Sequence, residues 1–133
     1  MYKILIAEDE RDILDLISFT LQHGGYQVIP TSNGTQALER TRSELPNLVL
    51  LDIRMPGMSG YEVCKQIKSN KLTSHIPVVF LSAKGQESEI KTGYETGAID
   101  YILKPFAPEQ LLIRLNQILY LHQGEDHLSW LKQ

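Results

Sequence analysis

Short continuous apolar runs alternate along the chain with segments whose apolar residues recur at helical spacing. Three runs are uninterrupted, at 4–7, 48–51 and 78–81, and two weaker candidates lie at 27–30 and 101–103. Runs of this length suit strands that are buried on both faces, as in a parallel sheet. We therefore expect five strands.

The segments between and after these runs predict five helices. Gly24 and Gly25 end the first helix, and Asn33 precedes the second. Ser59 and Glu62 form a capping box at the start of the third, and Pro108 suits the first position of the fifth. The fourth, at about 86–95, has a thin apolar stripe. The residues expected to face inward are Ile13, Ile17, Leu21, Ala37, Leu38, Thr41, Val63, Cys64, Ile67, Ile90, Tyr94, Leu111, Leu115, Ile118 and Leu119.

The strand–helix order repeats five times, which predicts an α/β fold. Right-handed crossovers between parallel strands give an open, doubly wound five-stranded sheet with helices on both faces. A chain of 133 residues with 42% hydrophobic and 22% charged residues suits one domain of this kind.

Charge and cysteine content narrow the function. A net charge of -3 provides no overall field for nucleic acid or anionic lipid, so we expect neither as a direct partner. No apolar run approaches the roughly 20 residues of a membrane helix. The single cysteine, Cys64, excludes an internal disulfide and a cysteine-based metal site. We expect a cytoplasmic protein.

Five polar residues follow the predicted strands at one end of the sheet. Glu8 and Asp9 come after the first strand, Asp52 ends the third, Ser82 ends the fourth and Lys104 follows the fifth. Each alone is more often a turn, cap or solvated residue than a functional one. Together they are unusual, because ligands of such sheets bind beyond the carboxyl ends of the strands.

The electrostatics of this group predict a cation and a phosphoryl group. Two carboxylates about 4 Å apart repel by roughly 4 kcal/mol at an effective dielectric constant of 20. Mg²⁺ binds carboxylates together with phosphate oxygens, and Lys104 adds a positive charge suited to phosphate. A carboxylate can itself accept a phosphoryl group. The group therefore has the parts of a phosphoaspartate site.

Four motifs carry a resemblance that covers residues 3–121. They are Glu8-Asp9, the run from Leu50 to Gly60, Leu81-Ser82-Ala83, and the run from Asp100 to Phe106. The chain resembles the CheY-like receiver domain of bacterial two-component response regulators, and the segment from Ser82 to Phe106 is similar to receivers of the OmpR/PhoB class. The resemblance implies a flavodoxin-like strand order, 2-1-3-4-5.

The resemblance also implies roles for the site residues. Asp52 would be the phosphoacceptor, and Lys104 and Ser82 would bind the phosphoryl group. Ser82 and Tyr101 would form the switch pair, and the Lys104-Pro105 peptide bond would be cis. The expected partner is a histidine kinase or a histidine phosphotransfer protein. The domain would assist its own phosphorylation and dephosphorylation without being an enzyme on other substrates.

The resemblance assigns a Mg²⁺ cofactor to four residues. Asp9 and Asp52 would be ligands, Glu8 would act mainly through water, and the backbone carbonyl of Arg54 would complete the protein's share. Arg54 also weighs against a haloacid-dehalogenase-like phosphatase, which needs an aspartate at that position. A nucleotide-binding fold would need a glycine-rich loop after the first strand. A phosphorylation-independent pseudo-receiver would lack one of the site residues, and all are present.

The last expectation concerns a partner surface on the fifth helix. Ile113 and Tyr120 fall opposite the stripe that faces the sheet, and Ile99 and Tyr120 stand where the OmpR/PhoB class carries charges of its dimer contact. We expect residues 1–122 to form the receiver and 123–133 a tail or the start of a linker. Either the tail covers Ile113 and Tyr120, or the helix 4/strand 5/helix 5 surface meets a second copy or an effector. The chain is either a stand-alone receiver or part of a longer regulator.

Overall fold

The computed structural model describes residues 2–83 and 85–131, and side chains as far as residue 122. Five strands and five helices alternate, as the apolar pattern predicts. The strands are β1 (Lys3–Ala7), β2 (Gln27–Thr31), β3 (Leu48–Asp52), β4 (Val78–Ser82) and β5 (Asp100–Leu103). The helices are α1 (Arg11–His23), α2 (Gly34–Glu44), α3 (Gly60–Ser69), α4 (Glu87–Glu95) and α5 (Pro108–Leu131).

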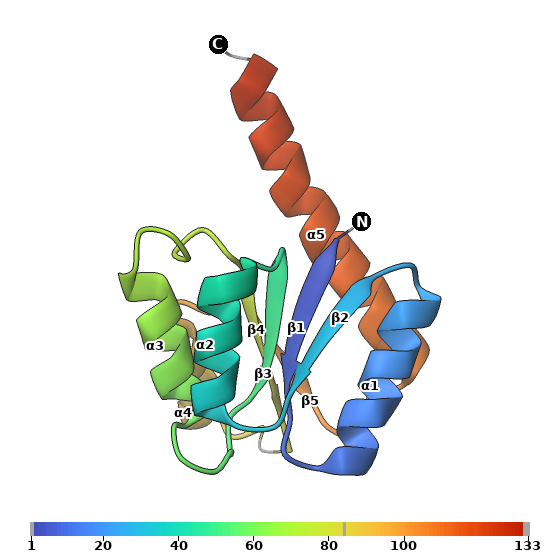
Figure 1. The fold of residues 1–133 in the computed structure, drawn as a ribbon, viewed down its shortest axis with the longest axis vertical. Helices are drawn as coiled ribbons and strands as arrows, with labels where there is room; N and C mark the ends of the chain where they lie inside the picture. Colours follow the sequence, from blue (N-terminus) through green and yellow to red (C-terminus); the bar gives the residue numbers. More distant parts are fainter. Residues whose placement is uncertain (1, 84, 132–133) are drawn as a thin grey trace.

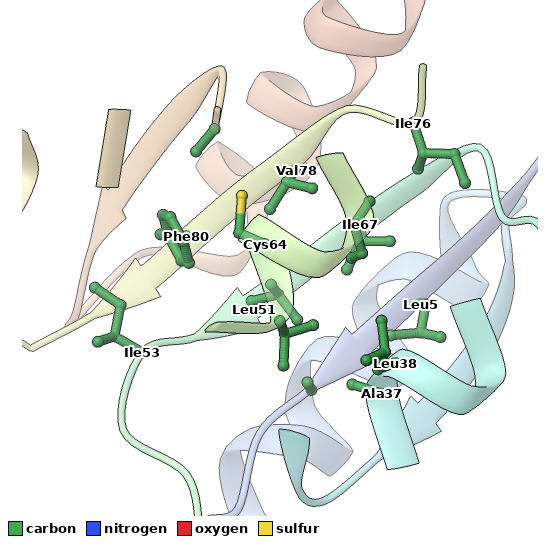
Figure 2. Packing of buried hydrophobic residues seen from close by; sticks show 14 of the residues in the cluster. Leu5, Ala37, Leu38, Leu51, Ile53, Cys64, Ile67, Ile76, Val78 and Phe80 are labelled. Carbon is green, nitrogen blue, oxygen red and sulfur yellow. The ribbon is translucent and has the colours of Figure 1, made fainter. Parts of the chain in front are cut away.

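The sheet is parallel and has the order β2-β1-β3-β4-β5, which confirms the expected topology. Helices α1 and α5 cover one face, and α2, α3 and α4 cover the other (Figure 1). Each face has its own core. In Figure 2, Phe80 of β4 and Leu51 of β3 lie beneath Cys64 and Ile67 of α3. Because both faces are covered, β3 and β4 are buried along their whole length.

Side-chain caps mark the starts of two helices, α2 and α3. The Asn33 side chain accepts a hydrogen bond from the backbone N–H of Gln36 at the start of α2. The Ser59 hydroxyl accepts one from the N–H of Glu62 at the start of α3. Both helix starts agree with the sequence prediction, because a cap satisfies backbone donors that the first turn leaves unpaired.

The prediction for α4 is partly wrong. Tyr94 is 45% exposed and does not face the core, whereas Gly93 is buried. The sequence pattern counts apolar side chains, so it cannot identify a glycine as the residue that faces the sheet. The backbone of α4 can therefore approach the sheet closely at this position.

The C-terminal tail does not adopt the folded-back arrangement that was one of its two predicted alternatives. The backbone of residues 123–131 continues α5 in one helix, and α5 projects beyond the sheet (Figure 1). It therefore does not fold back over Ile113 and Tyr120, which are 56% and 75% exposed. In the described part of the chain, no helix combines the length and the apolar character needed to cross a membrane.

Candidate functional site

Of the polar residues predicted at the strand ends, all but Glu8 line one cleft, and Glu8 is fully buried beside Lys104. Asp52 and Ser82 are the last residues of β3 and β4, and Lys104 directly follows β5. All strands are parallel, so these ends meet at the same edge of the sheet. The cleft has a volume of about 230 Å³. Its lining residues are Asp9, Glu10, Asp52, Arg54, Ser82, Ala83 and Lys104.

Lys104 connects two carboxylates that lie far apart in the sequence. Its Nζ atom lies 2.5 Å from Oε1 of Glu8 and 3.3 Å from Oδ2 of Asp52. The side chains of Glu8 and Asp52 are almost completely buried, and that of Lys104 is 12% exposed. One ammonium group therefore faces two carboxyl groups in a poorly solvated place, where charge interactions are stronger than at the surface.

Glu8 is the most perturbed of these groups. Burial, and then the neighbouring Asp52 carboxyl, raise its pKa to about 8, although the Lys104 ammonium opposes this rise. Burial alone would lower the pKa of Lys104, but its interactions with Glu8 and Asp52 outweigh burial and raise that pKa, so the lysine stays charged. One oxygen of Glu8, Oε2, is buried and has no hydrogen-bond partner among the described residues. A buried, unpaired carboxyl oxygen is costly, so the site is incomplete without a further cation or proton.

Three acidic side chains gather at this end of the sheet, and two of them, Asp9 and Asp52, line the cleft. Oxygen atoms of Glu8, Asp9 and Asp52 all lie within 4.8 Å of one another, and Asp9 is the exposed member. The second oxygen of Asp52, Oδ1, accepts a hydrogen bond from the backbone N–H of Arg54 at 3.4 Å. The two oxygens of Asp52 therefore have different surroundings, one facing Lys104 and the other facing the loop after β3.

Gly60, the last residue of the motif that begins at Leu50, shapes this loop. The N–H of Gly60 donates to the carbonyl of Ile53 at 2.8 Å, so α3 begins directly against the end of β3. A Cβ atom at Gly60 would clash with the backbone carbonyl of Asp52. Because only glycine fits, the start of α3 and the Asp52 strand end form one closely packed unit.

Of the two predicted switch residues, Ser82 lines the cleft and Tyr101 lies in β5, the strand that pairs with β4. Ser82 and Tyr101 are both buried, with 3% and 7% exposure. The Tyr101 ring packs against Phe80, with 6.3 Å between ring centroids. The Lys104-Pro105 peptide bond is cis, as expected.

An apolar groove beside the site was not predicted. It has a volume of about 280 Å³ and shares Lys104 and Ala83 with the acidic cleft. Its remaining lining comes from α1 and the loop after β5: Ile13, Leu16, Pro105 and Phe106. Leu16 and, one turn on, Phe19 are 45% and 61% exposed. The helical pattern of α1 predicts only the stripe that faces the sheet, so it gives no signal for these exposed apolar residues.

Comparison with known proteins identifies the family. Residues 4–116 match the model of the response regulator receiver domain. The chain belongs to this family. It is 41% identical over 117 residues to the alkaline phosphatase synthesis transcriptional regulatory protein PhoP of Bacillus subtilis, an alignment that covers 88% of this chain and 48% of PhoP. The chain spans about half the length of the curated relatives it matches.

Solved receiver domains have the same fold. A CheY-like receiver domain protein of Methanospirillum hungatei superimposes with a TM-score of 0.88 at 28% identity, covering 94% of this chain and 98% of the other. The BeF3-activated DrrB receiver domain gives a TM-score of 0.82 at 34% identity, covering 90% and 98%. The chain is thus a receiver with a phosphoacceptor signalling role, and the phosphatase alternative is set aside.

Proposed function

We propose that Asp52 is the phosphoacceptor of this receiver domain. The observation that supports it most strongly is Lys104, which lies 3.3 Å from the Asp52 carboxylate inside the cleft at the strand ends. Among the acids of the cleft, Asp52 is both buried and open to the cleft from the end of a rigid strand. A fixed carboxylate beside an ammonium group suits phosphoryl transfer, which depends on positioning and charge neutralisation.

The phosphoryl transfer replaces one bond to phosphorus with another. A carboxylate oxygen of Asp52 bonds to the phosphorus of the donor as the donor's P–N or P–O bond breaks, and the leaving group keeps the electron pair. The ammonium of Lys104 offsets the charge on the phosphoryl oxygens, and the Ser82 hydroxyl donates a hydrogen bond to one of them. Attack by water on the phosphorus later breaks the bond to Asp52 and releases inorganic phosphate. The domain in this way assists its own phosphorylation and dephosphorylation.

The acidic residues fit a Mg²⁺ ion. Asp9 and Asp52 offer carboxylate oxygens, Glu8 has a buried oxygen that lacks a hydrogen-bond partner among the described residues, and hard cations prefer oxygen ligands. The backbone carbonyl of Arg54 is the further ligand that we assign. A bound Mg²⁺ supplies positive charge that neutralises carboxylates and phosphoryl oxygens.

The phosphoryl donor in this proposal is a histidine kinase or a histidine phosphotransfer protein. Such a donor must place its phosphohistidine over Asp52, so its docking surface has to border the acidic cleft. The apolar groove between α1 and the loop after β5 does so, because both share Lys104 and Ala83. Exposed Leu16 and Phe19 then supply the apolar contact that a helical donor needs. Such a partnership places the protein in the cytoplasm.

The signal leaves the site through Ser82 and Tyr101. A phosphoryl group on Asp52 draws the Ser82 hydroxyl toward it, and the Tyr101 ring and α4 adjust to that movement. The changed surface lies along α4, β5 and α5, where exposed Ile113 and Tyr120 meet a second copy of the domain. In a longer regulator this change reaches an output domain beyond the receiver.

Phosphorylation from a small donor tests the proposal. Wild type and Asp52→Asn are incubated with acetyl phosphate, with and without Mg²⁺, and intact masses are measured. We expect one added phosphoryl group in wild type with Mg²⁺ and none in Asp52→Asn, which keeps the side-chain shape. An equal mass gain in both proteins would refute the role of Asp52.

A further inference from the structure

Helix α4 lies on a row of three aromatic rings from three different elements. The rings belong to Tyr61 of α3, Phe80 of β4 and Tyr101 of β5. Phe80 is the middle ring: it meets Tyr61 edge-on with 5.4 Å between centroids, and it lies 6.3 Å from Tyr101. Phe80 and Tyr101 are also register partners in the sheet. The row therefore runs from α3 to the proposed switch residue.

The backbone of α4 touches this row at Gly93. A Cβ atom there would lie 3.1 Å from Cδ2 of Phe80 and 3.2 Å from Cδ2 of Tyr101. A side chain at this position would press on both rings, so glycine lets the backbone of α4 pack directly against Phe80 and Tyr101. A movement of the Tyr101 ring would therefore be felt by α4. The whole of α4 belongs to the described part of the chain, and Gly93 is its one buried residue there.

A hydrogen bond from α3 ties the first half of α4 to this row. The Tyr61 hydroxyl donates to the backbone carbonyl of Glu89 at 3.1 Å. Burial raises the pKa of Tyr61, so the hydroxyl stays protonated as a donor at neutral pH. Three residues along α3, the Cys64 thiol donates to the carbonyl of Thr96, just past the end of α4. Both bonds come from one face of α3, and that of Tyr61 is the stronger donor.

The two helices joined by this bond leave the site from different strands. Helix α3 begins against Asp52, because the N–H of Gly60 bonds to the carbonyl of Ile53. Helix α4 follows Ser82 after a short loop. In the proposed switch, a movement of Ser82 toward a phosphoryl group on Asp52 would shift α4 against α3 and weaken the bond between Tyr61 and Glu89.

We propose that Tyr61 is a positioning residue, a latch whose hydroxyl holds α4 in its resting place and so sets how strongly a phosphoryl group must act to move the switch. The inference rests on the proposed function of Asp52. A ligand shifts an equilibrium only by its differential affinity for the two states. Removal of the latch should therefore make activation easier without altering the site.

Tyr61→Phe tests the latch, because it removes the hydroxyl and keeps the ring against Phe80. Tyr26→Phe is the matched control: its hydroxyl donates to Asn116 of α5, on the opposite face of the sheet. Beryllofluoride, which imitates a phosphoryl group on a carboxylate, is titrated in saturating Mg²⁺. Mg²⁺ affinity is measured separately, and amide exchange across 86–95 is followed in the free proteins.

We expect Tyr61→Phe to bind beryllofluoride about three- to tenfold more tightly, as the loss of one hydrogen bond predicts. Amide protection across α4 should fall, while Mg²⁺ affinity should match wild type. Tyr26→Phe should leave all three unchanged. A merely structural role would change protection without tightening the beryllofluoride complex.

Two results would overturn the inference and differ from a failure of the proposed function. One is beryllofluoride affinity in Tyr61→Phe equal to or weaker than in wild type. The other is the same gain in Tyr26→Phe. If wild type failed to bind beryllofluoride, or Asp52→Asn bound it equally well, the role of Asp52 and the latch would both fail.

Discussion

The Nζ atom of Lys104 lies 3.3 Å from Oδ2 of Asp52, although 52 positions separate the two residues in the sequence. The parallel sheet brings them together by placing the carboxyl ends of β3 and β5 at one edge, on either side of β4. Lys104 lies at the same time 2.5 Å from Glu8. It therefore interacts with two acids, and mutation can separate its proposed role in phosphoryl binding from that of the proposed Mg²⁺ ligands.

Lys104→Ala should separate phosphoryl binding from metal binding. We expect Mg²⁺ affinity to stay within about threefold of wild type, because the carboxylates remain. Beryllofluoride affinity should fall about ten- to hundredfold, the effect of losing a charge-assisted hydrogen bond. Separate titrations of the two ligands measure this, with Lys3→Ala, whose ammonium donates to the remote Glu44 carbonyl, as the control. A parallel loss of Mg²⁺ affinity would contradict the division of roles.

Glu8 should make the metal-free protein less stable as pH rises. Its pKa is about 8 in the folded chain against an ordinary value of 4.5, so between about pH 5 and 8 the folded state binds more protons than the unfolded state. The free energy of unfolding must then decrease with rising pH in this window. Mg²⁺ should reverse the trend, because it favours the carboxylate and binds more tightly at higher pH.

Thermal unfolding from pH 5 to 8, with and without Mg²⁺, checks the effect of Glu8. Glu8→Gln stays neutral and should flatten the dependence in the metal-free protein. If Glu8→Gln kept the slope of wild type, another group would be its cause.

Much of this site can be predicted from the sequence, and particular features cannot. Asp52, Ser82 and Lys104 follow apolar runs, so their convergence follows from the sheet. The burial of Glu8 and exposure of Asp9 do not, because adjacent residues after a strand carry no periodic signal. The bond from Tyr61 to Glu89 joins residues 28 positions apart and has no local pattern either.

The helices show the same division. Capping residues identify the starts of α2 and α3, since a cap is a local interaction. Gly93 faces the sheet without contributing to an apolar stripe, and the pattern therefore favoured Tyr94. Gly124 is typical of a helix end, yet the backbone of α5 continues to Leu131.

The groove beside α1, with the exposed Phe19 one turn from Leu16, should affect the rate of phosphorylation by protein donors and not by small ones. We expect Phe19→Ser to lower kcat/KM for phosphotransfer from a histidine phosphotransfer donor at least tenfold, because an exposed aromatic ring often dominates a docking contact. Phosphorylation by acetyl phosphate, which needs no docking surface, should keep its rate. Leu72→Ser removes an apolar side chain that is still more exposed, at 72% against 61% for Phe19, and should change neither rate. Equal losses with both donors would show damage to the site instead.

The exposed side of α5 should control self-association. Sedimentation of wild type with Mg²⁺ and beryllofluoride should give a concentration-dependent dimer. Tyr120→Glu should stay monomeric, since it places a charge in an apolar contact, while Leu72→Glu should behave as wild type. Monomers under all conditions would exclude the second copy as the partner of Ile113 and Tyr120.

The most direct test of the account is chemical trapping of the phosphorylated residue. Wild type is phosphorylated with acetyl phosphate and Mg²⁺ and then reduced with borohydride, which converts an aspartyl phosphate to homoserine. Peptide mapping then locates the change. The account predicts homoserine at position 52 and only when Mg²⁺ is present. Homoserine at Asp9 or another acid, with Asp52 intact, would contradict it.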